Sequence, residues 1–237
     1  LEGIAKHNGP LCAAGIDRPV PPTIAEYDSR HPLALDQFPG AEAQVAALAD
    51  DIAYNNHDID DGLRAGLVSI ADLAEVPLVG PVFQGVAARY PGIEDARLIH
   101  EAIRRLIDRM VGDLIGETQS RLAASKVKSA GEVRALGTPV VAFSAEMRHN
   151  DRALKAFLYE RMYRHCRVMQ MSQKARRVVH DLFTLYLAEP QSLPSEWSRL
   201  AAGPDDPQTA RVAADYLAGM TDRFALEEHR RLFGSCS

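Results

Sequence analysis

Apolar residues recur every three or four positions along most of the 237-residue chain, the spacing of helices with one buried face. In the longest such stretch, 94–123, the spacing predicts a single buried stripe of ten residues: Leu98, Ile99, Ala102, Ile103, Leu106, Ile107, Met110, Val111, Leu114 and Ile115. The same pattern predicts helices at 41–66, 82–90, 146–166, 168–188, 193–200, 207–218 and 220–232. Only VVAFS, 140–144, resembles a strand, and it is too short to build a sheet. The predicted class is all-α.

Proline and glycine divide this pattern. Residues 1–13 read as the end of a helix that stops at Asn8-Gly9-Pro10. Residues 14–40 are rich in proline and charge and are predicted to be one long loop, which in a compact domain is usually functional or mobile. A short helix is expected at 70–75, and 130–136 is ambiguous. The chain starts without Met and without a helix-starting residue, so we expect an N-terminal truncation.

Composition narrows the class of protein. The formal net charge of -5 gives no reason to expect a nucleic-acid-binding surface. The three cysteines are far apart and form no CxxC pair, so a reducing cytoplasm is the expected location. No apolar run is long enough for a transmembrane helix, and no signal peptide is recognised.

The segment ALADDIAYNNHDIDDG, 47–62, is both helical in pattern and rich in acids. At about 100° per residue, one side of its helix is apolar and forms the expected core face: Val45, Leu48, Ile52, Ile59, Leu63 and Leu67. The opposite side, called here the polar stripe, carries Asp50, Tyr54, His57, Asp58 and Asp61.

A solvated polar face is the simplest interpretation of this stripe. However, Tyr54 lies in its middle, and no Lys or Arg occurs from 42 to 63. Like charges on neighbouring turns destabilise a helix. A divalent cation, or a basic partner from elsewhere in the fold, would relieve the repulsion.

Three segments carry a resemblance: ADDIAYNNHDIDDGLRAG at 49–66, LKAFLYERMYRH at 154–165 and DYLAGMTDRFALEEHRRLF at 215–233. Together they resemble the deoxyguanosinetriphosphate triphosphohydrolase family of HD-domain proteins, over essentially the whole chain. The resemblance implies an all-α, multi-helix HD-domain-like bundle and hydrolysis of a deoxynucleoside triphosphate to deoxynucleoside and triphosphate. It further implies a homo-oligomer and one divalent ion, Mg²⁺ or Mn²⁺, held by ligands in the order His … His-Asp … Asp.

The resemblance also assigns roles to residues of the stripe. Asp50 matches the last metal ligand, Tyr54 lines the deoxyribose, and Asp58 accepts a hydrogen bond from the sugar 3′-hydroxyl. Asp51 points away, as a surface acid or an ion-pair partner. His57 then neighbours the site without binding the metal.

A different interpretation makes His57-Asp58 the metal pair of an HD phosphodiesterase. That pair needs one upstream His and one downstream Asp, and the available residues are His7, His31, Asp108 and Asp113.

If Asp50 is the fourth ligand, the other ligands and the general acid/base residues are expected N-terminal to Leu1. This chain then contains no catalytic residue and forms the C-terminal part of a single triphosphohydrolase domain, 1–237, with its C-terminal helical extension. One carboxylate cannot hold a catalytic divalent ion, so the chain alone is expected to be inactive. The alternative is a non-catalytic all-α protein that binds nucleotide or forms oligomers.

Two basic residues are assigned to the substrate by the resemblance. Lys6 is similar to a family lysine near the triphosphate, and an ordinary solvated lysine is the alternative. Arg223 lies in the C-terminal motif, where a packing or capping role is the alternative. The preferred base of the nucleotide is not predicted.

Overall fold

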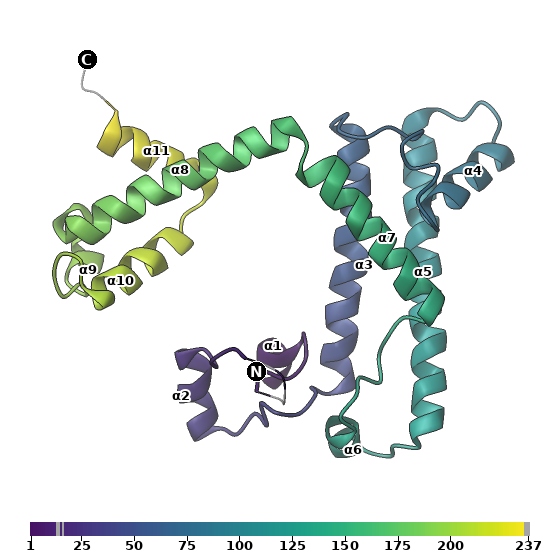
Figure 1. Ribbon diagram of the computed structural model, residues 1–237, viewed down its shortest axis with the longest axis horizontal. Coiled ribbons are helices and arrows are strands. Elements are labelled where there is room, and N and C mark those ends of the chain that lie inside the picture. Colours follow the sequence, from purple (N-terminus) through teal and green to yellow (C-terminus); the bar gives the residue numbers. More distant parts are fainter. Residues whose placement is uncertain (13–14, 16, 235–237) are drawn as a thin grey trace. The chain divides into compact units, whose positions relative to one another are not determined.

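The structure is a computed structural model that describes residues 1–12, 15 and 17–234, and this part of the chain is all-α, without a β-strand (Figure 1). The chain divides into two compact units, Leu1–Met162 and a second unit from Tyr163 onward. The all-α prediction is confirmed. Among the described residues, no helix combines the length and the apolar character that a membrane span needs.

The first unit is built on two long helices, α3 (Ala41–Arg64) and α5 (Asp95–Ser125), which pack along each other (Figure 1). Helix α4 (Val79–Arg89) packs on α5, and α7 (Ala145–Leu158) packs on α3. One buried cluster joins α3, α5 and α7 to the segment before α7: Ile52, Met110, Leu114, Val133, Val140, Val141, Phe143 and Met147. The periodicity of 94–123 therefore reports a real core face.

That face is narrower than the apolar pattern suggests. The buried positions of α5 are Leu98, Ile99, Ala102, Leu106, Met110 and Leu114. Val111 and Ile115 were expected in the same stripe, but they are 38% and 53% exposed. Each lies one residue after a buried position, about 100° further round the helix. Val45 on α3 was also expected in the core and is 45% exposed.

The N-terminal region corrects the predicted loop. Helix α1 (Glu2–Lys6) ends before Gly9, whose φ of 113° confirms the expected stop. Residues 14–40 are not loop throughout, because α2 (Pro22–Arg30) forms within them. Proline in the first turn is already set at a helical φ, and an i, i+4 pair between Glu26 and Arg30 supports the last turn.

Three short segments show how the structure differs from the sequence prediction or decides an ambiguous one. The stretch 70–75 forms successive i→i+3 turns, so the helix expected there is wrong. The ambiguous stretch contains α6 (Ala130–Ala135), capped by the Ser129 side chain. At 140–141, where a strand-like run was noted, the backbone forms a bend, and the Gln44 side-chain oxygen accepts the N–H groups of Val140 and Val141.

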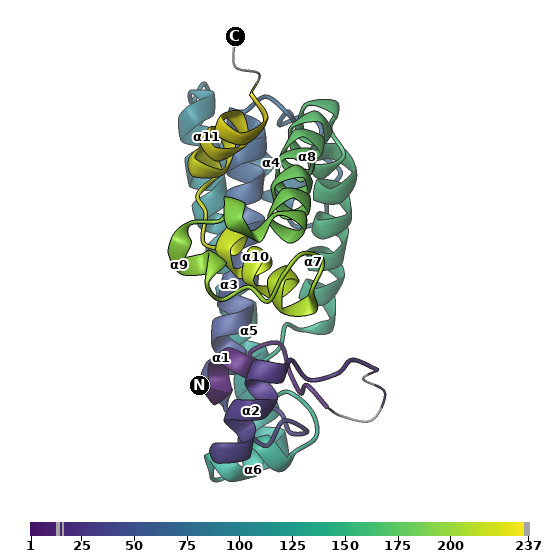
Figure 2. The ribbon, with the colours of Figure 1, turned by 90° about the vertical axis from the view of Figure 1, so that its left-hand side faces the viewer.

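The second unit wraps its helices around α8 (Cys166–Ala188), which follows a π-helical turn, η1 (Tyr159–Tyr163). After a 3₁₀ turn, η2 (Pro190–Ser192), come α9 (Ser195–Ser198), α10 (Pro207–Ala218) and α11 (Asp222–Phe233) (Figures 1 and 2). Its core consists of Val178, Leu182, Tyr186, Leu193, Val212 and Ala213. Trp197 packs against this core, with its ring 5.3 Å from that of Tyr216.

Candidate functional site

Helix α3 presents the acids as the helical pattern predicted. Ile52 and Ile59 are buried at 3% and 0% exposure, and they hold one face of α3 in the core. On the other side Asp50, Tyr54, His57 and Asp61 are exposed, and Asp58 is partly buried. Tyr54 shows 60% of its surface, which is unusual for a large aromatic side chain and leaves its ring open to a ligand.

The two adjacent aspartates of this helix differ in what they contact. Asp51 Oδ2 lies 3.1 Å from the Nζ atom of Lys155 on α7. The side chain of Asp50, one residue earlier, is exposed and forms no hydrogen bond or ion pair with any residue that the structure describes. The basic partner that the charge pattern called for therefore exists, and of the two adjacent aspartates it pairs with Asp51.

Lys155 belongs to a partly buried network that joins α3 to α7. Its Nζ atom also lies 3.1 Å from Asp151 Oδ2, while Asp151 Oδ1 accepts a 2.9 Å hydrogen bond from the Asn55 amide. Desolvation alone would lower the pKa of Lys155, but its bonds to Asp151 and Asp51 outweigh that effect and raise the pKa. Because Asn55 is one residue from Tyr54, this network sets which way the polar stripe faces.

Sequence reasoning missed Asn55, Asp151 and Lys155. Asn55 is only 3% exposed and Asp151 only 7%. Hydrophobic periodicity cannot find a buried polar pair, since each residue looks like a surface residue in its own helix. The usable signal was that an acid-rich stretch without Lys or Arg needs a cation from elsewhere.

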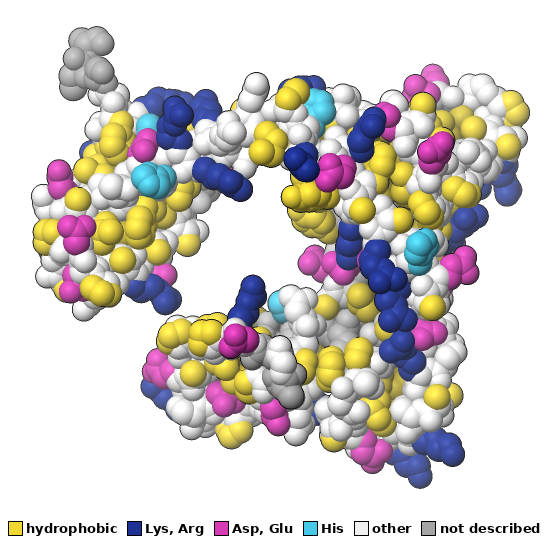
Figure 3. Space-filling view, viewed as in Figure 1, with side chains coloured by type: hydrophobic (Ala, Val, Ile, Leu, Met, Phe, Trp, Pro, Cys, Tyr) yellow, Lys and Arg dark blue, Asp and Glu magenta, His cyan; other side chains and the backbone are white. Residues whose placement is uncertain are grey.

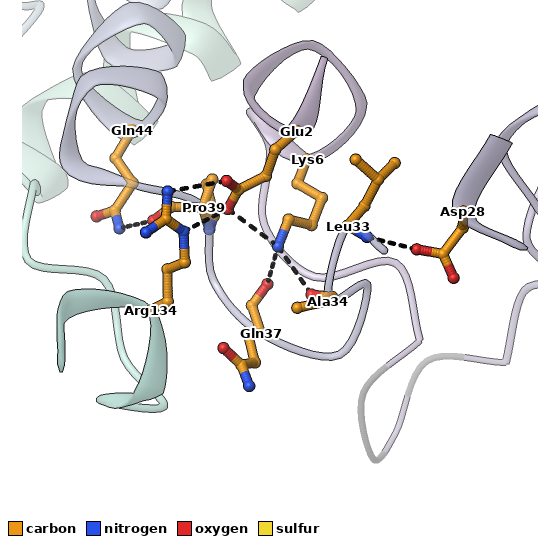
Figure 4. Close-up of polar contacts among 9 residues, drawn as sticks. All are labelled: Glu2, Lys6, Asp28, Leu33, Ala34, Gln37, Pro39, Gln44 and Arg134. Carbon is orange, nitrogen blue, oxygen red and sulfur yellow. Dashed lines mark hydrogen bonds and ion pairs between the residues drawn. The ribbon is translucent and has the colours of Figure 1, made fainter. Parts of the chain in front are cut away.

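Lys6 lies in a separate cluster near the N-terminus (Figure 4). Its side chain is fully buried, and its Nζ atom donates to the carbonyl oxygens of Ala34 at 2.8 Å and Gln37 at 3.2 Å. Its third partner is Glu2 at 3.3 Å, which also accepts two hydrogen bonds from Arg134 on α6. The alternative of a solvated lysine is therefore wrong, and all three N–H donors are used inside the chain. A contact of Lys6 with triphosphate stays a prediction.

Arg223 lies on α11 of the second unit. Its side chain is 90% exposed and donates to Glu227 at 2.9 Å, one turn further along the helix. The cap of this helix is Thr221, whose side chain accepts the N–H of Phe224, so Arg223 does not fill that role. Its contact with substrate also stays a prediction.

Two of the residues considered as further metal ligands beside His57-Asp58 make other contacts in the structure. His31 packs its ring against Tyr27 at 5.1 Å, and Asp113 accepts the backbone N–H of Ser144 at 2.9 Å. Across residues 1–12, 15 and 17–234, the fold brings together no group of three or more His, Cys, Asp or Glu side chains that could hold a metal. Either interpretation of the stripe therefore needs ligands beyond the described residues.

A cavity opens next to the polar stripe, on the side of Asp51. It measures about 210 Å³ and lies between the Asn8-Gly9 turn, Phe38-Pro39 and α3. Its rim is mixed in polarity, with Gln44 and Asp51 among apolar side chains.

The comparisons with known proteins give the family. A model for a phosphohydrolase-associated domain matches residues 141–231. The chain is 57% identical, over 98% of its length, to a deoxyguanosinetriphosphate triphosphohydrolase-like protein of Parvibaculum lavamentivorans. The chain belongs to this family. It is 52% identical to the protein of the same name in Caulobacter vibrioides and 50% identical to deoxyguanosinetriphosphate triphosphohydrolase-like protein 1 of Mesorhizobium japonicum, in each case over 98% of the chain.

These triphosphohydrolase-like relatives are longer than the chain, which spans 58–59% of their length. The match to the associated domain covers α7 to α11 apart from the last residues of α11, and includes Asp151 and Lys155. Helix α3 and its polar stripe lie outside that match. The family is thus established, whereas the roles of Asp50, Tyr54 and Asp58 rest on the geometry of α3 and on the resemblance.

Proposed function

We propose that the family protein to which this chain belongs hydrolyses a deoxynucleoside triphosphate to deoxynucleoside and triphosphate with the help of a divalent ion. In this proposal Asp50 is the last metal ligand, and Tyr54 and Asp58 face the sugar. One observation carries it: of two adjacent aspartates, Asp51 is committed to Lys155, whereas Asp50 is exposed and uncommitted within the described residues.

Asp50 suits a hard divalent cation such as Mg²⁺ or Mn²⁺, which prefers carboxylate oxygen. When bound, such an ion would polarise a phosphoryl oxygen and lower the pKa of a water molecule. Since the described residues gather no full ligand set and the chain spans about 59% of its relatives' length, we propose that the remaining ligands come from the rest of the family protein. The chain alone is then inactive.

Tyr54 and Asp58 continue the face that Asp50 begins. Successive positions four residues apart lie about 6 Å apart along a helix axis and on the same side. A nucleotide whose α-phosphate lies near Asp50 would therefore extend its sugar along α3. The Tyr54 ring offers an apolar surface for the deoxyribose, and the Asp58 carboxylate can accept a hydrogen bond from the 3′-hydroxyl.

Product analysis tests the function. A longer family protein that contains this chain is incubated with each deoxynucleoside triphosphate and Mn²⁺, and the products are separated by ion-exchange chromatography. We expect deoxynucleoside and triphosphate in equal amounts, and none from the chain alone. Release of pyrophosphate or of single phosphates would contradict the proposal. Nucleotide binding without any turnover by the longer protein would favour the non-catalytic alternative.

A pair of variants separates the two interpretations of the stripe. If His57-Asp58 is the metal pair, His57→Ala removes the metal and Asp50→Ala retains it. Our proposal expects the reverse, because Asp50 is the ligand and His57 only its neighbour. Tyr54→Ala is expected to weaken substrate binding while leaving the metal in place, since its ring contacts sugar and not the ion.

A further inference from the structure

The N-terminal half of α8 continues the core face of that helix beyond the helices that cover it (Figure 1). Further along α8, Leu182 and Tyr186 are fully buried in the core of the second unit. Met171, Ala175 and Val179 lie on the same side of the helix, within about 60° of those two residues. However, Met171 is 66% exposed and Val179 is 50% exposed. We call Met171, Ala175 and Val179 the α8 ridge.

A hollow lies on each side of the α8 ridge. One hollow of about 720 Å³ opens between α8 and α10, where Ala214 and Leu217 form its far wall. The other, of about 180 Å³, lies between α8 and α11, where Ala225 and Leu226 form its far wall. The last two residues of the α8 ridge line both hollows. A ridge of side chains with a groove on either side is the kind of surface on which another helix packs.

The charge beside the α8 ridge is almost entirely positive. Residues 161–180 contain six Lys or Arg and no Asp or Glu. Lys174 and Arg176 lie about 100° to either side of Ala175, and neither side chain forms a hydrogen bond or ion pair with any residue in the described ranges. On the face drawn in Figure 3, dark-blue Lys and Arg side chains border this part of α8. Asp222 is the one acid among the residues that line the two hollows.

We propose that the α8 ridge binds an amphipathic helix with acidic residues along the edges of its apolar face, contributed by the part of the family protein that lies outside this chain. The chain spans 58–59% of the length of its relatives, so a large part of that protein is available to cover the ridge. An acidic helix would complement Lys174 on one side and Arg176 on the other. The inference does not depend on the proposed activity.

Two other classes of partner fit this surface less well. The bases of a nucleic acid would need exposed aromatic side chains on which to stack. Phe183 is the one aromatic residue that lines either hollow, and it packs against the core of the second unit. A membrane surface binds apolar side chains that protrude from a helix lying in its plane. Concave hollows are filled better by the side chains of a packed helix.

Alkylation of a cysteine on the α8 ridge tests whether the ridge is covered. Met171→Cys is made in a background in which Cys12, Cys166 and Cys236 are replaced by Ser. Its reaction with a maleimide is timed in this chain alone and in a longer family protein that contains it. We expect the reaction to be at least about tenfold slower in the longer protein. The matched control is Gln173→Cys, on the opposite, exposed side of α8, which should react equally fast in both proteins.

Two results would overturn the inference. One is an equal rate for Met171→Cys in the two proteins, because the rest of the family protein would then leave the ridge uncovered. The other is slow reaction in the chain alone, because the cover would then come from the chain itself or from a second copy. Circular dichroism confirms that each variant is folded.

Charge reversal tests whether the occupant is acidic. In the longer protein with Met171→Cys, Lys174→Glu combined with Arg176→Glu should speed alkylation toward the rate in the chain alone, because like charges would then face each other. Arg177→Glu is the matched control, since this side chain leaves α8 about 160° away from Ala175 and should not affect the rate. If the double variant is protected as well as its parent, the proposed partner is wrong.

Discussion

Asp151 is the acceptor that Asn55 and Lys155 share, so Asp151→Ala should destabilise the first unit. The change removes a 2.9 Å hydrogen bond between a carboxylate and an amide that is 3% exposed. Hydrogen bonds to charged groups contribute about 1.5–3 kcal/mol, and an unsatisfied buried donor adds to the loss. We expect the free energy of unfolding to fall by about 3 kcal/mol.

Asp51→Ala is the matched control, because it removes the other acceptor of the same lysine. The side chains of Asp51 and Lys155 are 49% and 42% exposed. An ion pair in that setting contributes about 0.2–1 kcal/mol. Replacing Asp by Ala inside a helix raises the helix propensity and so stabilises both variants by a similar small free energy. This contribution cancels when the two variants are compared.

Urea unfolding followed by far-ultraviolet circular dichroism measures both free energies. A double-mutant cycle between Asp151→Ala and Asn55→Ala should give a coupling energy of at least about 1 kcal/mol, because the two side chains bond directly. If the unfolding free energies of Asp151→Ala and Asp51→Ala differ by less than about 0.5 kcal/mol, the idea that burial makes the Asp151 contacts stronger is refuted.

Three further outcomes follow from contacts elsewhere in the chain. Lys6→Met should leave two backbone carbonyl groups without their hydrogen-bond donor and lower the stability of this region by about 2 kcal/mol. Limited proteolysis should then cleave residues 1–39 faster than in the natural protein. The hydrogen bonds from Arg134 lower the pKa of Glu2. The stability that this ion pair contributes is therefore fully present above the ordinary carboxyl pKa and is lost as the pH falls through the lowered pKa. The stability difference between the natural protein and Arg134→Leu should therefore shrink on acidification, which urea unfolding at a series of pH values measures. Leu182→Ala opens a cavity in the core of the second unit and should cost about 2–5 kcal/mol, which Trp197 fluorescence can follow because that residue packs on the same core.

The helices were predictable from the sequence because their signal is local. The bounds predicted for the helix at 207–218 agree with α10 to the residue, and 94–123 agrees with α5 to within two residues at each end. The helix within 14–40 was missed because proline and charge dominate that segment, although Pro22 lies in the first turn of α2, where proline is compatible with a helix.

The candidate site was predictable only in part. The direction of the polar stripe follows from the 3.6-residue period, which the exposure of Asp50 and the burial of Ile52 bear out. The commitment of Asp51 to Lys155 depends on a residue 104 positions away, and no pattern within one helix contains it. Lys6 shows the same limit, because its burial depends on carbonyl groups at 34 and 37.

The difference between Asp50 and Asp51 is the most direct test of the proposed function. We would measure the bound metal by mass spectrometry in a longer family protein that contains this chain, in the Asp50→Asn and Asp51→Asn variants. The proposal predicts that Asp50→Asn loses the ion and that Asp51→Asn keeps it, since of these two side chains only Asp51 is already paired within the described residues. Retention of the ion by Asp50→Asn, or its loss in Asp51→Asn alone, would contradict the assignment.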